Sequence, residues 1–214
     1  MGTPTILINN AAAAVTGWPL VPSSDASRST LSPSQASHTV TVNTISHFNT
    51  LSAFLPFLTS APNGGTVVTI SSILAHLGPA SLSDYAASKA AASSLHHTLM
   101  HEIHAHADAK IRQNLKTVLV EPGQLDTQLF SELTTLPWYA NFLGPVLEAK
   151  DVAKEIVRVL GRGDGGVIRM PFYAKWVPWY AVAPSSIQAF SRWFSGIDSS
   201  IVVGAVPTSA RAVA

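Results

Sequence analysis

The chain has 214 residues, which is enough for one α/β domain with a sizeable core, and it contains no cysteine, so disulfides and thiol chemistry are excluded. Its 13 basic and 12 acidic residues give a formal net charge of +1 without any basic run, which argues against nucleic acid as a partner. Only 12% of the residues are charged and 47% are hydrophobic, and this apolar balance predicts either dimerisation or a membrane-facing patch.

Short apolar runs rich in β-branched residues recur along the chain and predict buried strands. The predicted strands are 5–8, 66–70, 116–120 and 167–170. None of the apolar runs reaches the roughly 18 residues that a membrane-spanning helix needs, and the first ten residues do not have the pattern of a signal peptide.

Segments in which apolar residues recur every three or four positions predict helices between these strands. The predicted helices are 37–58, 83–107 and 149–160, with Ser81 or Ser83 as the cap of the second. Residues 16–37 are rich in Ser, Thr and Pro and predict a surface loop. Irregular chain with a short helix is expected after Gly123.

Strands that alternate with helices predict right-handed βαβ units and a parallel sheet. Ligands of such sheets bind beyond the carboxyl ends of the strands. Three of the predicted strands lead directly into candidate polar or turn residues, namely Asn9-Asn10, Ser71-Ser72 and Pro122-Gly123. The sequence therefore predicts a binding site at this edge of the sheet.

Ser72, Tyr85 and Lys89 have the spacing of a known catalytic segment. Ser72 ends a predicted strand, and Tyr85 and Lys89 lie one turn apart on the following helix. This arrangement resembles the short-chain dehydrogenase/reductase family. The resemblance implies that Tyr85 exchanges a proton with the substrate oxygen as hydride moves, that Ser72 binds that oxygen, and that Lys89 holds the nicotinamide ribose. A nearby ammonium and an oxidised nicotinamide are expected to lower the pKa of Tyr85 from its usual value near 10.

Further segments resemble the same family. Asn43 matches an asparagine that holds a water of the proton relay, and Asn9-Asn10-Ala11-Ala12 resembles an Asn-Asn-Ala-Gly motif with Ala12 in place of the glycine. Pro122-Gly123 and Thr127 resemble a Pro-Gly-x-x-x-Thr motif that meets the nicotinamide carboxamide. The resemblance thus implies the catalytic residues Asn43, Ser72, Tyr85 and Lys89 and the cofactor-binding residues Asn9, Asn10, Ala11, Tyr85, Lys89, Pro122, Gly123 and Thr127.

The family's Thr-Gly-x-x-x-Gly-x-Gly turn, which lets the backbone approach a pyrophosphate, does not occur in these 214 residues. The strand at 5–8 matches the family's fourth strand. We therefore expect one partial domain over residues 1–214, a Rossmann-like three-layer α/β/α parallel sheet that is N-terminally truncated and keeps family strands 4 to 7. The strand at 5–8 then becomes an apolar sheet edge, and dinucleotide binding is expected to be weak. The cofactor is NADP or NAD, with NADP slightly favoured by the resemblance, since the residues that select between them are absent.

Residues 172–200 form a second region of interest, because they are apolar, rich in aromatic side chains and predicted to be helical. They resemble the retinol and 17β-hydroxysteroid dehydrogenase-like branch of the family. That resemblance implies a lipophilic alcohol or ketone as substrate and a place on the cytoplasmic side, at the endoplasmic reticulum or a lipid-droplet surface. The aromatic side chains suit an interfacial or lid role, or equally a simple cover for the sheet.

Two alternatives concern partners. The family resemblance implies a homodimer through the Asn43 and Tyr85 helices, so a non-catalytic partner of a full-length dehydrogenase is the alternative function. The histidines His96, His97, His101, His104 and His106 fit an exposed helix face or a dimer contact about as well as a ligand set, and no metal site is predicted.

Overall fold

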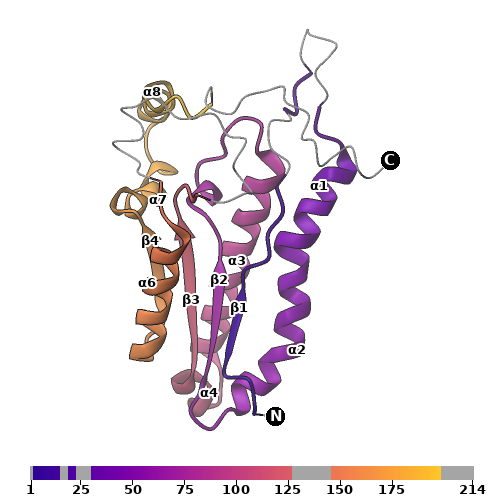
Figure 1. The fold of residues 1–214 in the computed structure, drawn as a ribbon, viewed down its shortest axis with the longest axis vertical. Helices are drawn as coiled ribbons and strands as arrows, with labels where there is room; N and C mark the ends of the chain where they lie inside the picture. The colour runs from indigo at the N-terminus through magenta and orange to yellow at the C-terminus, as the bar shows by residue number, and fades with distance from the viewer. Residues whose placement is uncertain (1, 15–18, 23–29, 127–145, 199–214) are drawn as a thin grey trace.

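A computed structural model describes residues 2–14, 19–22, 30–126 and 146–198 of the chain (Figure 1). Within these ranges, four parallel strands form one sheet in the order β1-β2-β3-β4. The strands are β1 (Ile6–Asn9), β2 (Gly65–Ile70), β3 (Leu115–Pro122) and β4 (Gly166–Met170). They match the four predicted strands, and their carboxyl ends lie at the top of Figure 1.

Helices cover both faces of the sheet, which confirms the predicted α/β/α layers. On one face α2 (Ser46–Ser60) and α3 (Ser83–Ala105) pack against the sheet through a core that includes Leu51, Val67 and Leu99. On the other face α6 (Ala149–Arg162) contributes Val152 and Ile156 to a second core around Val118 and Ile168.

The strand β1 is an edge of the sheet, because β2 is its one partner among the described strands. Leu7 and Asn9 point into the molecule, whereas Ile6 and Ile8 are 47% and 49% exposed. The predicted apolar edge is therefore present in this chain.

The helix predicted at 37–58 begins earlier and is built from three parts. These are α1 (Pro33–Val40), a π-helical turn η1 (Thr41–Ile45) and α2. Ser32 and Gln35 form a capping box, and Pro33 is compatible with a first helical turn. The prediction that 33–37 belong to a loop is wrong, because Ser and Pro in this order start a helix.

Two further details differ from the predictions around α3. Neither Ser81 nor Ser83 caps the helix, since the N-cap is Leu82 and no side chain makes the capping hydrogen bond. Ser81 instead adopts a left-handed φ of 60° in the turn before it. A short helix that was not predicted, α4 (Ala109–Asn114), follows α3, with Asp108 as its N-cap.

The C-terminal part of the described chain lies at the carboxyl edge of the sheet, on the side of β4 (Figure 1). It comprises η4 (Phe172–Lys175), α7 (Val177–Tyr180) and α8 (Ser185–Ser195), and α8 ends at the left-handed Gly196. Neither α7 nor α8 buries a residue. Arg192 ties α8 to the loop after β2, because its guanidinium donates to Leu77 O at 2.8 Å and to Gly78 O at 3.1 Å.

None of the helices in the described ranges is both long enough and apolar enough to cross a membrane.

Candidate active site

The chain leaves β2 through Ser71 and Ser72 and then forms the 3-10 turn η2 (Ile73–Ala75). Ser72 is the N-cap of this turn, and its Oγ accepts a hydrogen bond from Leu74 N at 3.2 Å. The turn therefore holds the buried Ser72 hydroxyl at the carboxyl end of the sheet.

Tyr85 and Lys89 reach the same place from the first turns of α3. Lys89 Nζ lies 5.7 Å from the centroid of the Tyr85 ring, and the Ser72 hydroxyl is near enough to Tyr85 to favour its phenolate. Lys89 Nζ also donates to Ile70 O, the last carbonyl of β2, at 2.9 Å. The structure thus brings together the three residues whose spacing suggested a catalytic segment.

Burial is the largest influence on the pKa values of Tyr85 and Lys89. It raises the pKa of Tyr85 to about 12, although the nearby Ser72 hydroxyl lowers it. It also lowers the pKa of Lys89 to about 8. In the chain without cofactor, desolvation of the phenolate outweighs the effect of its neighbours, and the expected lowering in the presence of an oxidised nicotinamide stays a prediction.

Asn43 lies in the π-helical turn, and both polar atoms of its side chain form hydrogen bonds. Its Nδ2 donates to Ala13 O at 2.8 Å and to Ser88 Oγ at 2.9 Å, and its Oδ1 accepts from Ala13 N at 2.7 Å. Asn43 therefore joins the segment after β1 to α3 at the residue before Lys89. Its role in a proton relay stays a prediction.

Asn9, at the end of β1, has a buried side chain whose Oδ1 accepts from Thr50 Oγ1 at 2.8 Å. Its Nδ2 has no hydrogen-bond partner among the described residues, and the same holds for both ring nitrogens of the buried His47. Asn10 and Ala11 follow at the surface. An unpaired buried donor at a strand end, near exposed backbone, fits the polar groups of a nicotinamide riboside.

Pro122 and Gly123 are buried where β3 ends, and Gly123 N donates to Met170 O at 2.7 Å. A Cβ at Gly123 would come within 2.6 Å of Tyr173 Oη and 3.0 Å of Pro171 Cδ, so glycine is what lets η4 close over this strand end. Thr127, the last predicted cofactor residue, lies outside the described residues.

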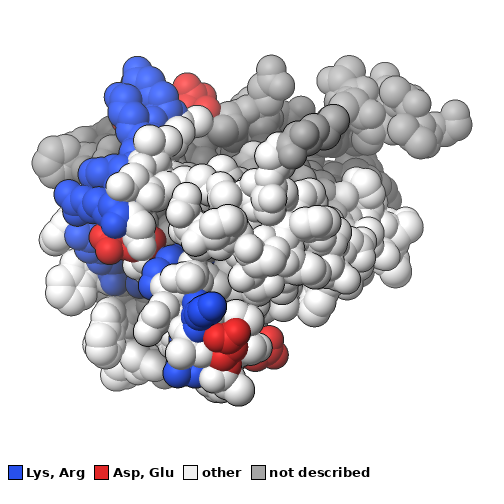
Figure 2. Space-filling view, turned by 90° about the horizontal axis from the view of Figure 1, so that it is seen from below, with Lys and Arg blue, Asp and Glu red and all other residues white. Residues whose placement is uncertain are grey.

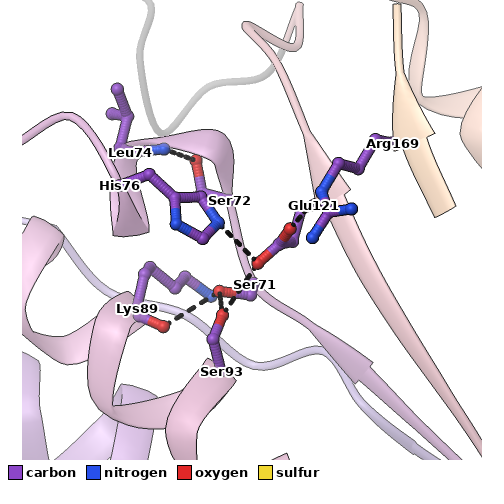
Figure 3. A network of polar contacts seen from close by, with 8 residues as sticks. All are labelled: Ser71, Ser72, Leu74, His76, Lys89, Ser93, Glu121 and Arg169. Atoms are coloured by element: carbon purple, nitrogen blue, oxygen red, sulfur yellow. Dashed lines mark hydrogen bonds and ion pairs between the residues drawn. The ribbon is translucent and has the colours of Figure 1, made fainter. Parts of the chain in front are cut away.

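The prediction overlooked a group of charged residues around Glu121 (Figure 3). Glu121 is 0% exposed, and its carboxylate contacts His76, Ser93 and Arg169. Burial alone would raise its pKa, but the hydrogen bonds and charges of His76 and Arg169 outweigh burial and lower the pKa. The available signal was a carboxylate inside an apolar strand, directly before Pro122-Gly123.

The histidines of α3 differ in their burial. His96 is buried and its Nδ1 lies 2.9 Å from Thr69 Oγ1, whereas His101 and His104 are exposed. In the described part of the chain, no three His, Cys, Asp or Glu side chains lie close enough to hold a metal ion.

Comparison with known sequences identifies a family profile and several relatives that match this chain. The sequence profile of short chain dehydrogenases matches residues 1–137. The uncharacterized oxidoreductase TDA5 of Saccharomyces cerevisiae is 36% identical over 132 residues, which is 62% of this chain and 38% of the yeast protein. Human retinol dehydrogenase 10 is 34% identical over 146 residues, which is 68% of this chain and 39% of the human protein. The matches thus span well under two thirds of these relatives' own lengths.

Solved structures share the fold. A short chain dehydrogenase from Burkholderia cenocepacia in complex with NADP superposes with a TM-score of 0.65 and 24% identity, over 89% of this chain and 70% of that one. The angucycline C-6 ketoreductase LanV with bound NADP gives a TM-score of 0.56 and 21% identity, over 77% and 60% of the two chains. At these identities the likeness shows the fold.

Proposed function

The chain belongs to the short-chain dehydrogenase family, and on that premise we propose that it carries the proton-transfer site of an NAD(P)-dependent oxidoreductase that interconverts a lipophilic alcohol and its ketone or aldehyde. One observation carries the proposal, namely that Ser72, Tyr85 and Lys89 meet at the carboxyl end of β2. Each of these side chains has a chemical role that its geometry supports.

The Tyr85 hydroxyl is the proton donor or acceptor. With a pKa of about 12 in the chain by itself, it is protonated at neutral pH, which is the form that gives a proton to a carbonyl oxygen. The Ser72 hydroxyl lies near the Tyr85 hydroxyl and orients the substrate oxygen beside it. The Lys89 side chain lies over the Tyr85 ring, where its ammonium stabilises the phenolate left after the proton has moved.

The nicotinamide cofactor, when bound, supplies or accepts the hydride. Lys89 would hold the ribose hydroxyls, the free Nδ2 of Asn9 would meet the nicotinamide riboside from the end of β1, and Pro122 and Gly123 would line its other side. Two solved relatives of the same fold contain NADP, which supports NADP as the first candidate over NAD.

A lipophilic substrate is supported by the surroundings of Tyr85. Its ring packs with Leu82, Leu74 and Ala14, so the side chain that exchanges the proton lies among apolar groups. A relative that matches 68% of this chain is a retinol dehydrogenase, which fits a retinoid-, steroid- or lipid-like substrate.

A membrane or lipid-droplet surface on the cytoplasmic side is the proposed location. Trp176, Trp179 and Trp193 of the C-terminal segment are 63%, 68% and 77% exposed, and indole rings favour the interface between water and lipid. Lys175 of the same segment lines a groove with Arg158 and Arg162 of α6. Figure 2 shows Lys and Arg side chains gathered along one side of the molecule, which suits anionic lipid headgroups.

A homodimer through α2 and α3 is the proposed assembly. Phe48, Phe54 and Phe57 on α2 are large apolar side chains that remain exposed in the single chain. The same face supports the second candidate function, in which the chain is a non-catalytic partner that pairs with a full-length dehydrogenase.

A substrate panel tests the first function. NADPH-dependent reduction of retinoid, steroid and long-chain aldehydes or ketones is measured for the protein and for Tyr85→Phe, with Tyr180→Phe as the control. We expect Tyr85→Phe to lose nearly all turnover while its affinity for NADPH is kept. A protein that reduces none of these substrates, binds no NADPH and still associates with a full-length dehydrogenase would support the second function.

A further inference from the structure

Glu121 connects the segments that carry Ser72 and Lys89. We propose that Glu121 is a positioning residue for the proposed reaction, whose buried carboxylate fixes the Ser72 turn through His76 and the Lys89 turn of α3 through Ser93. The inference rests on the proposed function, and it concerns a residue that touches none of the reacting groups itself.

The link to Ser72 passes through the turn η2. His76 is the C-cap of this turn and Ser72 is its N-cap, so the two residues mark its ends. His76 Nε2 lies 3.0 Å from Glu121 Oε1, and next to an ionised carboxylate this nitrogen is the donor. Glu121 therefore holds the far end of the turn that presents the Ser72 hydroxyl to Tyr85.

The link to Lys89 passes through two serines. The Ser93 hydroxyl lies 3.2 Å from Glu121 Oε1 and 2.8 Å from Ser71 Oγ, so its one proton is shared between two acceptors. Ser71 Oγ in turn donates to Lys89 O at 2.9 Å. Ser71 N also donates to Val120 O at 2.8 Å, which joins the ends of β2 and β3. The carboxylate thus anchors the helical turn from which the Lys89 side chain extends.

Arg169 completes the environment of the carboxylate from the other side. Its Nε donates to Glu121 Oε2 at 2.7 Å from β4, and Figure 3 shows His76 and Arg169 approaching Glu121 from opposite sides. A buried charge with donors on both oxygens is fixed in direction, because any rotation would leave one donor unpaired. Arg169 itself contacts neither the Ser72 turn nor α3 in the network drawn there.

A purely structural role would predict something different. Glu121 would then contribute to stability alone, and its replacement would lower the amount of folded protein without changing each folded site. A positioning role predicts a loss in kcat per folded molecule that exceeds any change in the KM for NADPH, because Asn9, Pro122 and Gly123 still hold the cofactor while Ser72 and Lys89 lose their fixed places.

The variants are Glu121→Gln, His76→Leu and His76→Gln, with Leu58→Ala as a destabilised control at the opposite end of the sheet. Glutamine at 121 is nearly isosteric but presents an NH2 group to one of the donors. We expect kcat per folded molecule to fall about tenfold or more in Glu121→Gln and His76→Leu. His76→Gln restores a donor within reach of Glu121 and is expected to recover most of the loss.

Hydrogen exchange gives a readout that does not depend on turnover. The peptide covering residues 71–77 contains the Leu74 amide that donates to Ser72 Oγ, and we expect it to exchange faster in Glu121→Gln and His76→Leu but not in Leu58→Ala. Unchanged kcat and unchanged exchange in His76→Leu would overturn the inference, even if Glu121→Gln does not fold. Faster exchange with turnover that survives Tyr85→Phe would instead keep the positioning role and overturn the proposed function.

Discussion

The side chain of Asn43 pairs with the backbone of Ala13 in both directions, accepting from its N–H at 2.7 Å and donating to its C=O at 2.8 Å. Asn43 is completely buried and sits in a π-helical turn, while Ala13 follows β1. The pair therefore fixes the segment after β1 against the helix layer, next to the candidate active site.

Replacing Asn43 is expected to destabilise the fold. Asn43→Ala removes three hydrogen bonds and leaves both polar groups of Ala13 without their partner, so we expect the free energy of unfolding to fall by about 2–4 kcal/mol. Urea unfolding measures the change. Asn49→Ala, at an exposed position of α2, is the control and should change the value by less than about 0.5 kcal/mol. Equal values for the two variants would contradict the role assigned to the Asn43 pair.

Stability is expected to fall as the pH drops from about 6.5 towards 4. Burial lowers the pKa of His47 to about 4, and burial together with His97 lowers the pKa of His96 to about 4. Between these values and 6.5 the unfolded chain binds a proton at each site and the folded chain does not, so unfolding is favoured by up to about 3 kcal/mol for each histidine. The pKa of Glu121 is also lowered, so its contribution is lost at still lower pH.

Thermal unfolding across this pH range measures the effect. The double variant His47→Gln, His96→Gln should show a flatter decline in melting temperature between pH 6.5 and 4 than the unaltered chain. His101→Gln, at an exposed position of the same helix as His96, should leave the slope as it was. A double variant with an unchanged slope would show that other groups cause the acid sensitivity.

Gly123 is expected to be required for stability, because the Tyr173 hydroxyl leaves no room for a side chain at this position. The Cβ of Gly123→Ala would lie 2.6 Å from Tyr173 Oη, so we expect a loss of about 1–3 kcal/mol in the free energy of unfolding. In a Tyr173→Phe background the hydroxyl is gone and the loss should be smaller, which a double-mutant cycle measures. Gly161→Ala is the control, because nothing lies within 4 Å of its added Cβ and alanine favours the helix α6. A loss that is the same in both backgrounds would mean that Pro171 and not Tyr173 opposes the side chain.

The four strands and the three residues Ser72, Tyr85 and Lys89 could be predicted because their signals are local. An apolar run marks a buried strand, and a spacing of four places two side chains on one helix face. The start of α1 differs from the prediction for a local reason as well, because Ser32-Pro33 fits a loop by composition and a helix cap by position.

The environment of those residues could not be predicted in the same way. Glu121 meets His76 and Arg169, which are 45 and 48 positions away in the sequence, so its partners appear only when three strand ends come together. The pKa of Tyr85 likewise depends on burial by Leu82 and its neighbours, and no spacing in the sequence measures that burial.

Membrane binding through the C-terminal segment is expected to depend on its tryptophans. Trp179 and Trp193 are exposed on α7 and α8, and burying one large apolar side chain contributes about 1.5–3 kcal/mol. Trp179→Ala and Trp193→Ala should each weaken binding to vesicles about tenfold or more, since 1.4 kcal/mol corresponds to a factor of ten. Cosedimentation with phosphatidylcholine vesicles, with and without phosphatidylserine, measures the binding.

The matched control lies on another face of the same protein. Phe54→Ala and Phe57→Ala remove exposed aromatic rings from α2, the proposed dimer surface, and should leave vesicle binding unchanged while weakening self-association. Phosphatidylserine should strengthen binding, because Lys175 and the basic side chains of α6 lie beside the aromatic segment. If the tryptophan variants bind vesicles as well as the unaltered protein, while the α2 variants do not, the membrane-facing surface is α2 and the C-terminal helices serve as a cover for the substrate.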